Sequence, residues 1–356
     1  MFDIRVYENR EWVGLLQDTA SVQWQEFYAK PGEVKIVAAA TEQNRALLRK
    51  GNRLYSSDFD TIARIEQVEW SESRAKSTLT VRACATAALL DERVVMAVVN
   101  VLNVEQAMYA VYGMNRRGLP IASFSPIGYG EEVETQLCWG SVLDGLKTLA
   151  EVSGLGFKVF FDASLGEEYL YVYKGVDRRA GQPGYGGCLQ LDGGGEHSVV
   201  TSSANCKNVA VVEGGSDGKV VTVSPIGVAG EARRELYVDA KHLQKQYRVA
   251  HNTGNEDVYG NPIYTYTTQT YPDADYTAQL YNAGLKALLE QTEVFEIESR
   301  AAGQLMQYGV DYGLGDIVPV RVPAYEGSVD MRVEAVKRVY ETSGERTILG
   351  LRAVDG

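Results

Sequence analysis

The fold is decided by the stretch Ile62-Ala63-Arg64-Ile65-Glu66-Gln67-Val68-Glu69-Trp70, which is followed closely by Ser77-Thr78-Leu79-Thr80-Val81-Arg82-Ala83. In both segments apolar and polar side chains alternate, as they do in a strand that buries one face. The link between them, residues 71–76, is polar. The two segments therefore predict a β-hairpin.

The same pattern returns near the end of the chain. In the first copy Gly51 precedes a strand, Arg64-Ile65-Glu66-Gln67-Val68 follows, and Leu79-Thr80-Val81-Arg82-Ala83 closes the hairpin. In the second copy the order is Gly315-Asp316-Ile317-Val318, then Arg332-Val333-Glu334-Ala335-Val336, then Leu349-Gly350-Leu351-Arg352-Ala353, and the aromatic residues Trp70 and Tyr340 follow the first strands. Short matches between amphipathic hairpins also arise by chance, but the shared order and spacing favour a duplication. We therefore predict two related β-barrel or sandwich domains.

Segments outside the hairpins show which parts of the chain are strand and which are helix. Strands are predicted at residues 4–7, 12–16, 21–27, 34–38, 157–161, 169–173, 208–212 and 219–223, with Asp217-Gly218 as the turn of the last pair. Helices are predicted at residues 41–50, after Asn103, after Ser141 and at 275–290, since Thr41, Asn103 and Ser141 are good N-caps. The glycine-rich run at residues 179–196 predicts a mobile loop or linker rather than core.

These segments predict a mainly β fold with α+β insertions, in which two related β-barrel domains are accompanied by smaller α/β domains. A chain of 356 residues is too long for one ordinary core. The predicted domains are a first barrel at 1–99, an α/β insertion at 100–185, the first part of a second barrel at 186–272, a helical or α/β insertion at 273–300, and the closing strands of the second barrel at 301–356.

Composition limits the class of function. The net charge is −12, with 35 Lys and Arg against 47 Asp and Glu, so a basic protein that binds phosphate backbones is not expected. Cys84, Cys138, Cys188 and Cys206 form no CxxC pair and predict mostly buried, reduced thiols. The N-terminus has no secretory leader, and no apolar run reaches the roughly 18 residues that a membrane-spanning helix requires. We expect synthesis in the cytoplasm and no membrane anchor.

The motifs of common enzymes are missing from the sequence. His197, His242 and His251 stand alone, without a HExxH or Cys/His cluster, so we expect no metal site and no cofactor. The loop Gly214-Gly215-Ser216-Asp217-Gly218-Lys219 lacks the spacing of a phosphate-binding loop, and the run Gly193-Gly194-Gly195 lacks the strand and helix that such a loop joins. Both are predicted to be turns or linkers.

Carboxylates and tyrosines leave one enzymatic or sugar-binding alternative open. A glycosidase needs only two facing carboxylates, and the chain offers Asp311, Asp316, Glu131, Glu132, Glu134, Glu167 and Glu168. The pairs 131–132 and 167–168 are expected to be solvated charges, and Asp316 a residue of a strand-entry turn. A glycan-binding protein could use Tyr259, Tyr264, Tyr266 and Tyr271 as platforms, although alternating tyrosines are often packing residues. We predict no catalytic residue and no enzymatic activity.

The chain resembles the siphophage tail-hub proteins, which are similar in fold to the baseplate hub of contractile phages. The resemblance rests on Ile4-Arg5-Val6-Tyr7, Trp12-Val13-Gly14, Ser21-Val22-Gln23-Trp24, Pro31-Gly32-Glu33-Val34, the segments 44–52 and 89–94, and Tyr312-Gly313-Leu314-Gly315-Asp316-Ile317-Val318. From about residue 113 to 308 the chain matches in layout only.

The resemblance implies a structural virion protein at the tail tip. Such a protein is a homotrimer whose paired barrels form a pseudo-six-fold ring between the tail tube and the central tip. Implied partners are a distal tail or tube-end protein, a central tip, spike or fibre protein, and the tape measure protein, while DNA passes through the lumen without specific binding. Since the chain ends after the closing hairpin, no lytic domain is expected. A hub or spike of a tail-like bacteriocin or injection system is the nearer alternative.

Overall fold

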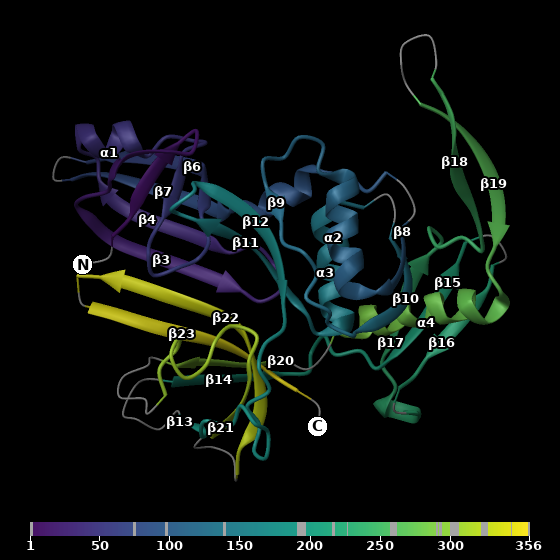
Figure 1. The fold of residues 1–356 in the computed structure, drawn as a ribbon. Coiled ribbons are helices and arrows are strands. Elements are labelled where there is room, and N and C mark those ends of the chain that lie inside the picture. Colours follow the sequence, from purple (N-terminus) through teal and green to yellow (C-terminus); the bar gives the residue numbers. More distant parts are fainter. Residues whose placement is uncertain are drawn as a thin grey trace.

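A computed structural model describes residues 3–354, apart from 74–75, 97–98, 138–139, 191–196, 216–217, 226, 257–261, 290, 292–293, 300–305, 322–326 and 343. The protein is mainly β, as the sequence predicts, and its largest element is a sheet of eleven strands (Figure 1). The strand order along this sheet is β13-β21-β22-β3-β4-β7-β6-β5-β1-β2, and β23 pairs with β22. Strands from both ends of the chain therefore share one sheet.

The first part of this sheet, which we call the first module, comes from the opening residues. Its alternating strands bury Val22, Trp24, Ile36 and Val81 in one hydrophobic cluster. Helix α1 begins where the side chain of Thr41 accepts the amide of Asn44, as the capping pattern predicts. The elements of the first module are β1 (Arg5–Glu8), β2 (Glu11–Leu15), β3 (Thr19–Phe27), β4 (Glu33–Ala39), α1 (Glu42–Leu47), β5 (Arg53–Tyr55), β6 (Ala63–Glu72) and β7 (Ser77–Ala85).

The second module is built from segments that lie far apart in the sequence, within residues 189–202, 294–299 and 317–353. Val318, Val333, Val336 and Leu351 lie in its own hydrophobic cluster. Leu189 is buried in the same cluster, and β13 pairs with β21, so this part of the glycine-rich run is core and not the predicted loop. The elements are β13 (Leu189–Gln190), β14 (His197–Ser202), β20 (Val294–Ser299), β21 (Ile317–Arg321), β22 (Val329–Glu341) and β23 (Gly344–Ala353).

The two predicted hairpins are equivalent in detail. Both carry a β-bulge after the same position, between Ile65 and Gln67 in β6 and between Val333 and Ala335 in β22. The amide of Gly51 donates to the carbonyl of Ile65, and the amide of Gly315 donates to the carbonyl of Val333. A bulge is a specific local geometry, so its recurrence beside the same glycine turn supports a duplication over a chance match.

The register corrects part of the alignment predicted from the sequence. Ile65 pairs with Ala83 and Val333 pairs with Leu351, so Ala83 is equivalent to Leu351 and not to Ala353. Counting from the bulge, Trp70 is equivalent to Arg338 rather than to Tyr340. The sequence alone misaligned the second strand by two residues because a shift of two preserves the alternation of faces.

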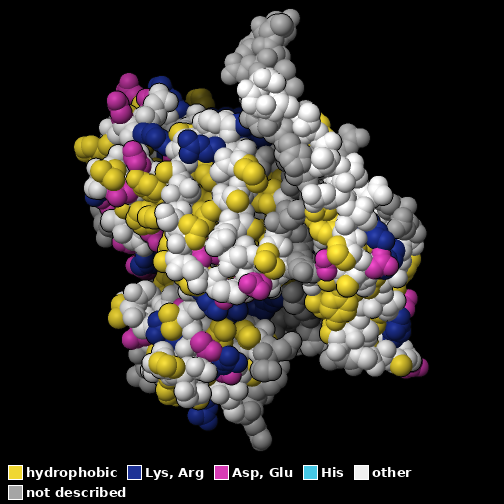
Figure 2. Space-filling model, turned by 45° about the vertical axis from the view of Figure 1, so that its right-hand side comes forward, with side chains coloured by type: hydrophobic (Ala, Val, Ile, Leu, Met, Phe, Trp, Pro, Cys, Tyr) yellow, Lys and Arg dark blue, Asp and Glu magenta, His cyan; other side chains and the backbone are white. Residues whose placement is uncertain are grey.

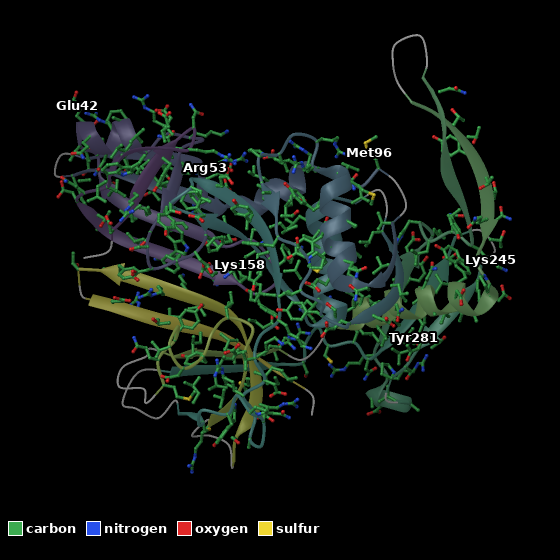
Figure 3. The ribbon with its side chains drawn as sticks, in the orientation of Figure 1. Glu42, Arg53, Met96, Lys158, Lys245 and Tyr281 are labelled. Carbon is green, nitrogen blue, oxygen red and sulfur yellow. The ribbon has the colours of Figure 1, made fainter. Side chains whose placement is uncertain are left out.

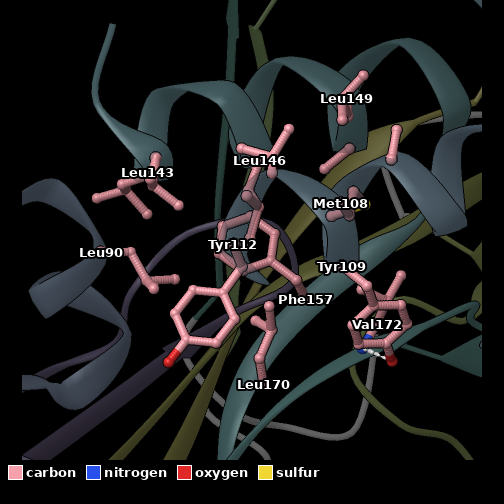
Figure 4. Packing of buried hydrophobic residues seen from close by; sticks show 14 of the residues in the cluster. Leu90, Met108, Tyr109, Tyr112, Leu143, Leu146, Leu149, Phe157, Leu170 and Val172 are labelled. Carbon is pink, nitrogen blue, oxygen red and sulfur yellow. Dashed lines mark hydrogen bonds between the residues drawn. The ribbon is translucent and has the colours of Figure 1, made fainter. Parts of the chain in front are cut away.

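An α/β unit lies between the two modules and the part of the molecule that carries the last helix (Figure 1). Asn103 and Ser141 cap its two helices as predicted, and Gly154 ends the second helix with φ +72°. Figure 4 shows Met108, Tyr112 and Leu146 packed with Phe157 and Leu170 of the sheet below. The elements are η1 (Thr86–Glu92), β8 (Val99–Asn103), α2 (Val104–Asn115), β9 (Ala122–Ser123), β10 (Glu132–Leu137), α3 (Val142–Ser153), β11 (Gly156–Asp162) and β12 (Glu167–Tyr173).

A fourth cluster lies where the last helix covers a small sheet. Tyr276 and Leu280 of the helix pack on Val212 and Val223, and a long hairpin projects beyond this unit (Figure 1). The elements are β15 (Val209–Gly214), β16 (Val220–Val223), η2 (Gly230–Ala232), β17 (Glu235–Ala240), the projecting hairpin β18 (Gln246–Glu256) with β19 (Pro262–Thr270), and α4 (Asp273–Leu289).

The architecture agrees with the predicted class but not with two closed barrels. The strands that the structure describes form a continuous open sheet across both modules and several small sheets. The predicted boundaries at 99, 185, 272 and 300 stay a prediction. Within the described ranges, no helix is long and apolar enough to cross a membrane.

Candidate functional site

The first candidate is the junction at which the two modules join edge to edge. Residues 335–341 of β22 pair antiparallel with residues 21–27 of β3, so one module continues the sheet of the other. Across this seam Arg338 lies 5.5 Å above the ring of Phe59, which in turn stacks on Trp24. Arg338 also donates to Glu345 at 2.7 Å. The seam is therefore held by backbone hydrogen bonds and by packed side chains from both modules.

Tyr28 is the main anchor beside the junction. Its hydroxyl donates to the carbonyl of Gly154 at 2.9 Å and accepts the amide of Gly175 at 3.1 Å. A Cβ atom on Gly315 would lie 2.1 Å from the Tyr28 ring, and one on Gly156 would lie 2.3 Å from it. These glycines are required because the backbone passes directly against the buried ring.

Asp316 organises the turn that opens the second module. The carboxylate is buried and accepts the amide of Val176 at 2.7 Å and that of Gly313 at 2.9 Å. The guanidinium of Arg178 donates to it at 2.6 Å. Charge-assisted bonds of this kind hold the chain that leaves the α/β unit against β21. Asp316 is thus a turn residue, as predicted, and also a structural anchor.

A recess of about 700 Å³ lies between the first module, β11 and residues 308–314. Glu26 lines it, and desolvation together with the charge of Asp60 raises the pKa of this carboxyl to about 7. The hydroxyl of Thr61 donates to Glu26 at 2.8 Å, and Lys158 pairs with Asp60. Burial also raises the pKa of Tyr308. A carboxyl that is half protonated near neutral pH makes this recess sensitive to pH.

The predicted carboxylates whose side chains the structure describes have separate partners. Glu168 is fully buried and pairs with Arg53, so the expectation of a solvated charge is wrong for this residue. Figure 3 labels Arg53 beside the strands of the first module. Its neighbour Glu167 is exposed and accepts the hydroxyl of Tyr169 at 2.6 Å. Glu131 pairs with Lys174, and Asp311 accepts the amide of Gln307 at 2.6 Å. Glu132 is exposed in β10, and the side chain of Glu134 lies outside the described residues.

The histidines and glycine loops are similarly scattered. His242 lines a groove of about 250 Å³ between α3 and α4, where burial lowers its pKa. The side chains of His197 and His251 are outside the described residues, as are Gly193-Gly194-Gly195, Ser216 and Asp217. Lys219 extends from its loop to the hydroxyl of Thr277 in α4 rather than into an anion cradle. In the part of the chain that the structure describes, no group of three or more His, Cys, Asp or Glu side chains is placed to hold a metal.

The structure describes some of the tyrosines proposed as sugar platforms and three of the four cysteines. Tyr271 stacks on Tyr247 with ring centroids 4.4 Å apart, whereas Tyr266 is exposed on β19. Tyr259 and the side chain of Tyr264 lie outside the described residues, as does Cys138. Cys84, Cys188 and Cys206 are free thiols of intermediate exposure, less buried than predicted.

Sequence reasoning missed the residues with the most demanding environments. Glu105 is completely buried in α2 and accepts the amides of Ile127, Gly128 and Tyr129 at 2.7 to 2.9 Å. Tyr28 and Glu26 also went unnoticed. A carboxylate on the buried face of a helix is a signal that could have identified Glu105, because such a charge requires donors.

Comparison with known proteins identifies a family. Residues 3–350 match the family described as Siphovirus ReqiPepy6 Gp37-like protein. The chain belongs to this family. Among curated protein sequences, none matches it.

Solved structures of phage tail proteins share the fold of this family member. The tail protein from Neisseria meningitidis MC58 superposes with a TM-score of 0.60 at 12% identity, covering 100% of this chain and 97% of the other. For the 43 kDa tail protein of prophage MuSo2 from Shewanella oneidensis, the TM-score is 0.58 at 12% identity, with 99% and 98% covered. Prophage tail protein gp18 from Listeria monocytogenes EGD-e gives 0.51 at 12% identity, with 99% and 95% covered. The resemblance to phage tail proteins is therefore confirmed for family and fold.

Proposed function

We propose that this protein is a structural subunit of the phage tail tip, a hub whose three copies form a pseudo-six-fold ring. The single observation that carries the proposal is the duplication: one chain holds two modules with the same hairpin, the same bulge and the same glycine turn. Three such chains around a three-fold axis present six similar modules. A ring of six similar modules can dock on a six-fold tail tube.

The surroundings of such a ring follow from the same arrangement. The hub would join the end of the tail tube, through a distal tail or tube-end protein, to a central tip, spike or fibre protein. The tape measure protein and then the DNA would pass through its lumen. The net charge of −12 supports a lumen that repels the phosphate backbone and does not bind it. On the face in Figure 2, Lys and Arg lie in small groups among hydrophobic and acidic side chains.

The proposed role is mechanical rather than catalytic. The buried carboxylates Glu105 and Asp316 are each held by several donors, which suits fixed structural anchors. The family and fold are consistent with a structural protein.

Mass measurement tests the proposal. Light scattering of the purified protein over a range of concentrations is expected to give three times the chain mass of 39.1 kDa, and negative-stain images are expected to show rings. A monomer at every concentration, or a closed dimer, would refute the hub. A lumen that retains duplex DNA at low salt would refute the proposed passage.

A further inference from the structure

Among the described strands that have a partner on one side only, two are related to the seam between β3 and β22. Beyond Arg64, strand β6 pairs with β7 but leaves its outer edge open at residues 67–72, which we call the β6 edge. Strand β14 pairs with β20 and leaves its other side open, which we call the β14 edge. Open strand edges invite pairing with another chain.

In the second module, the stretch that is equivalent to the β6 edge has a strand partner. Gln67–Glu72 of β6 are equivalent to Ala335–Tyr340 of β22, counted from the shared bulge. In β22 that stretch is covered, because it pairs with β3 of the first module. The same stretch of the same hairpin therefore has a strand partner in one copy and none in the other.

The β14 edge belongs to the strand that is equivalent to β3. In the first module the path β3-β4-β7 ends on the hairpin β6-β7. In the second module β14 pairs with β20, and β20 lies beside β23 of the hairpin β22-β23 (Figure 1). The chain order is also the same, with β3, β4, β5, β6 and β7 matched by β14, β20, β21, β22 and β23. Strand β14 is thus the second copy of β3.

We propose that β14 of one subunit pairs antiparallel with the β6 edge of the next, repeating between chains the pairing of β3 with β22 within a chain. This interface rests on the ring proposed above and identifies its partner surfaces. Three internal and three intermolecular seams would then alternate around one closed ring. Such a head-to-tail contact closes when the rotation between subunits is a third of a turn.

The two edges suit each other in length and chemistry. Each offers six residues, and residues 197–202, His-Ser-Val-Val-Thr-Ser, contain neither Lys nor Pro, the residues that commonly protect a free edge. Trp70 on the β6 edge is 55% exposed, and Val200 on the β14 edge is 47% exposed. Both would lose solvent contact in the proposed seam.

The internal seam also sets the register. The amide of Tyr28 donates to the carbonyl of Glu334, so Tyr28 and Glu334 are a hydrogen-bonded pair, and the pairs alternate from there. Gln23 and Val339 are consequently a non-hydrogen-bonded pair, in which side chains lie closest. Val22 and Val199 each pack on the hydrophobic cluster of their own module, and Val22 pairs with Ile36 as Val199 pairs with Ile297. We therefore align Val199 with Val22, which places Val200 at the position of Gln23. Ser71, the equivalent of Val339, should therefore lie opposite Val200 of the neighbouring subunit.

Disulfide trapping tests this register in the full-length protein. Under mild oxidation the double variant Ser71→Cys with Val200→Cys should form covalent trimers on denaturing gels, since opposed residues of this type lie within disulfide distance. The single variants, which keep the native cysteines, and the pair Ser71→Cys with Val220→Cys should not. A trimer in solution that shows no such cross-link overturns the seam while the ring stands. A monomer overturns both.

A matched pair of tryptophan variants tests the edge without a covalent bond. Trp70 on β6 and Trp12 on β2 are both exposed, at 55% and 63%. Trp70→Lys should weaken trimer formation at least tenfold, and Trp12→Lys should leave it unchanged, with thermal unfolding of the monomer confirming that both variants fold. Equal effects of the two variants, or no effect of Trp70→Lys, would overturn the proposal.

Discussion

Gly51 and Gly315 share one backbone conformation, since φ is +91° at both and the amide of each donates to the residue before its bulge. Only glycine adopts this conformation without strain. Their surroundings differ, however, because a Cβ on Gly51 would meet nothing within 4 Å, whereas one on Gly315 would overlap the ring of Tyr28. The two positions separate the cost of the backbone conformation from the cost of crowding.

Gly315→Ala is predicted to destabilise the protein far more than Gly51→Ala. The change at Gly51 adds only backbone strain, about 1 kcal/mol in the free energy of unfolding. At Gly315 the overlap with Tyr28 adds about 2 kcal/mol or more, because a packed core resists added atoms. Urea titration of both variants measures the difference. Equal losses would mean that Tyr28 moves aside easily and is not a fixed anchor.

The sequence predicted local structure well where a short-range cause determines it. Thr41, Asn103 and Ser141 cap helices because each side chain satisfies an amide within three residues. The bulged hairpins were recognisable because alternation and order survive in both copies. Contacts that join segments far apart in the chain left no local signal. The buried pair of Glu168 with Arg53 spans 115 residues, and the pairing of β3 with β22 joins opposite ends of the chain.

Glu105→Ala is predicted to lower the free energy of unfolding by roughly 2–4 kcal/mol. The substitution removes the acceptor of the amides of Ile127, Gly128 and Tyr129, and each hydrogen bond to a charged group contributes about 1 kcal/mol or more. Thermal or urea unfolding checks the loss. Glu132→Ala, at an exposed position of β10, is the matched control and should change stability by less than about 0.5 kcal/mol. Similar losses for both would contradict the anchoring role of Glu105.

Asp316→Asn tests the difference between the two copies, since Asn52 is the residue equivalent to Asp316. The Asn side chain at position 316 would lose the ion pair with Arg178. Its NH2 group would also point toward a backbone N–H that now donates to the carboxylate. We expect a loss of about 1–3 kcal/mol in the free energy of unfolding. The reverse change, Asn52→Asp, removes the donor to the carbonyl of Leu47 and should also destabilise the protein. A neutral Asp316→Asn would show that the carboxylate charge is dispensable.

Glu26→Gln is predicted to stabilise the protein above neutral pH. The folded-state pKa of Glu26 is raised from 4.5 to about 7, so between these values the folded protein binds more protons at this site than the unfolded chain does. Stability contributed by this group therefore falls as the pH rises from about 4.5 to about 7 and is constant above that range. Because the side chain is partly exposed, we expect roughly 1–2 kcal/mol, less than the full shift would give.

Gln cannot ionise, so the advantage of the variant should be largest at pH 8 and should shrink as the pH approaches 5. Thermal unfolding of both proteins from pH 5 to pH 8 measures this difference. Glu33→Gln, at an exposed position of β4, provides the control and should show no such trend. An advantage of Glu26→Gln that is the same at pH 5 and pH 8 would mean that folding does not raise the pKa of Glu26. The raised pKa of Glu26 would then not be what makes this recess respond to pH.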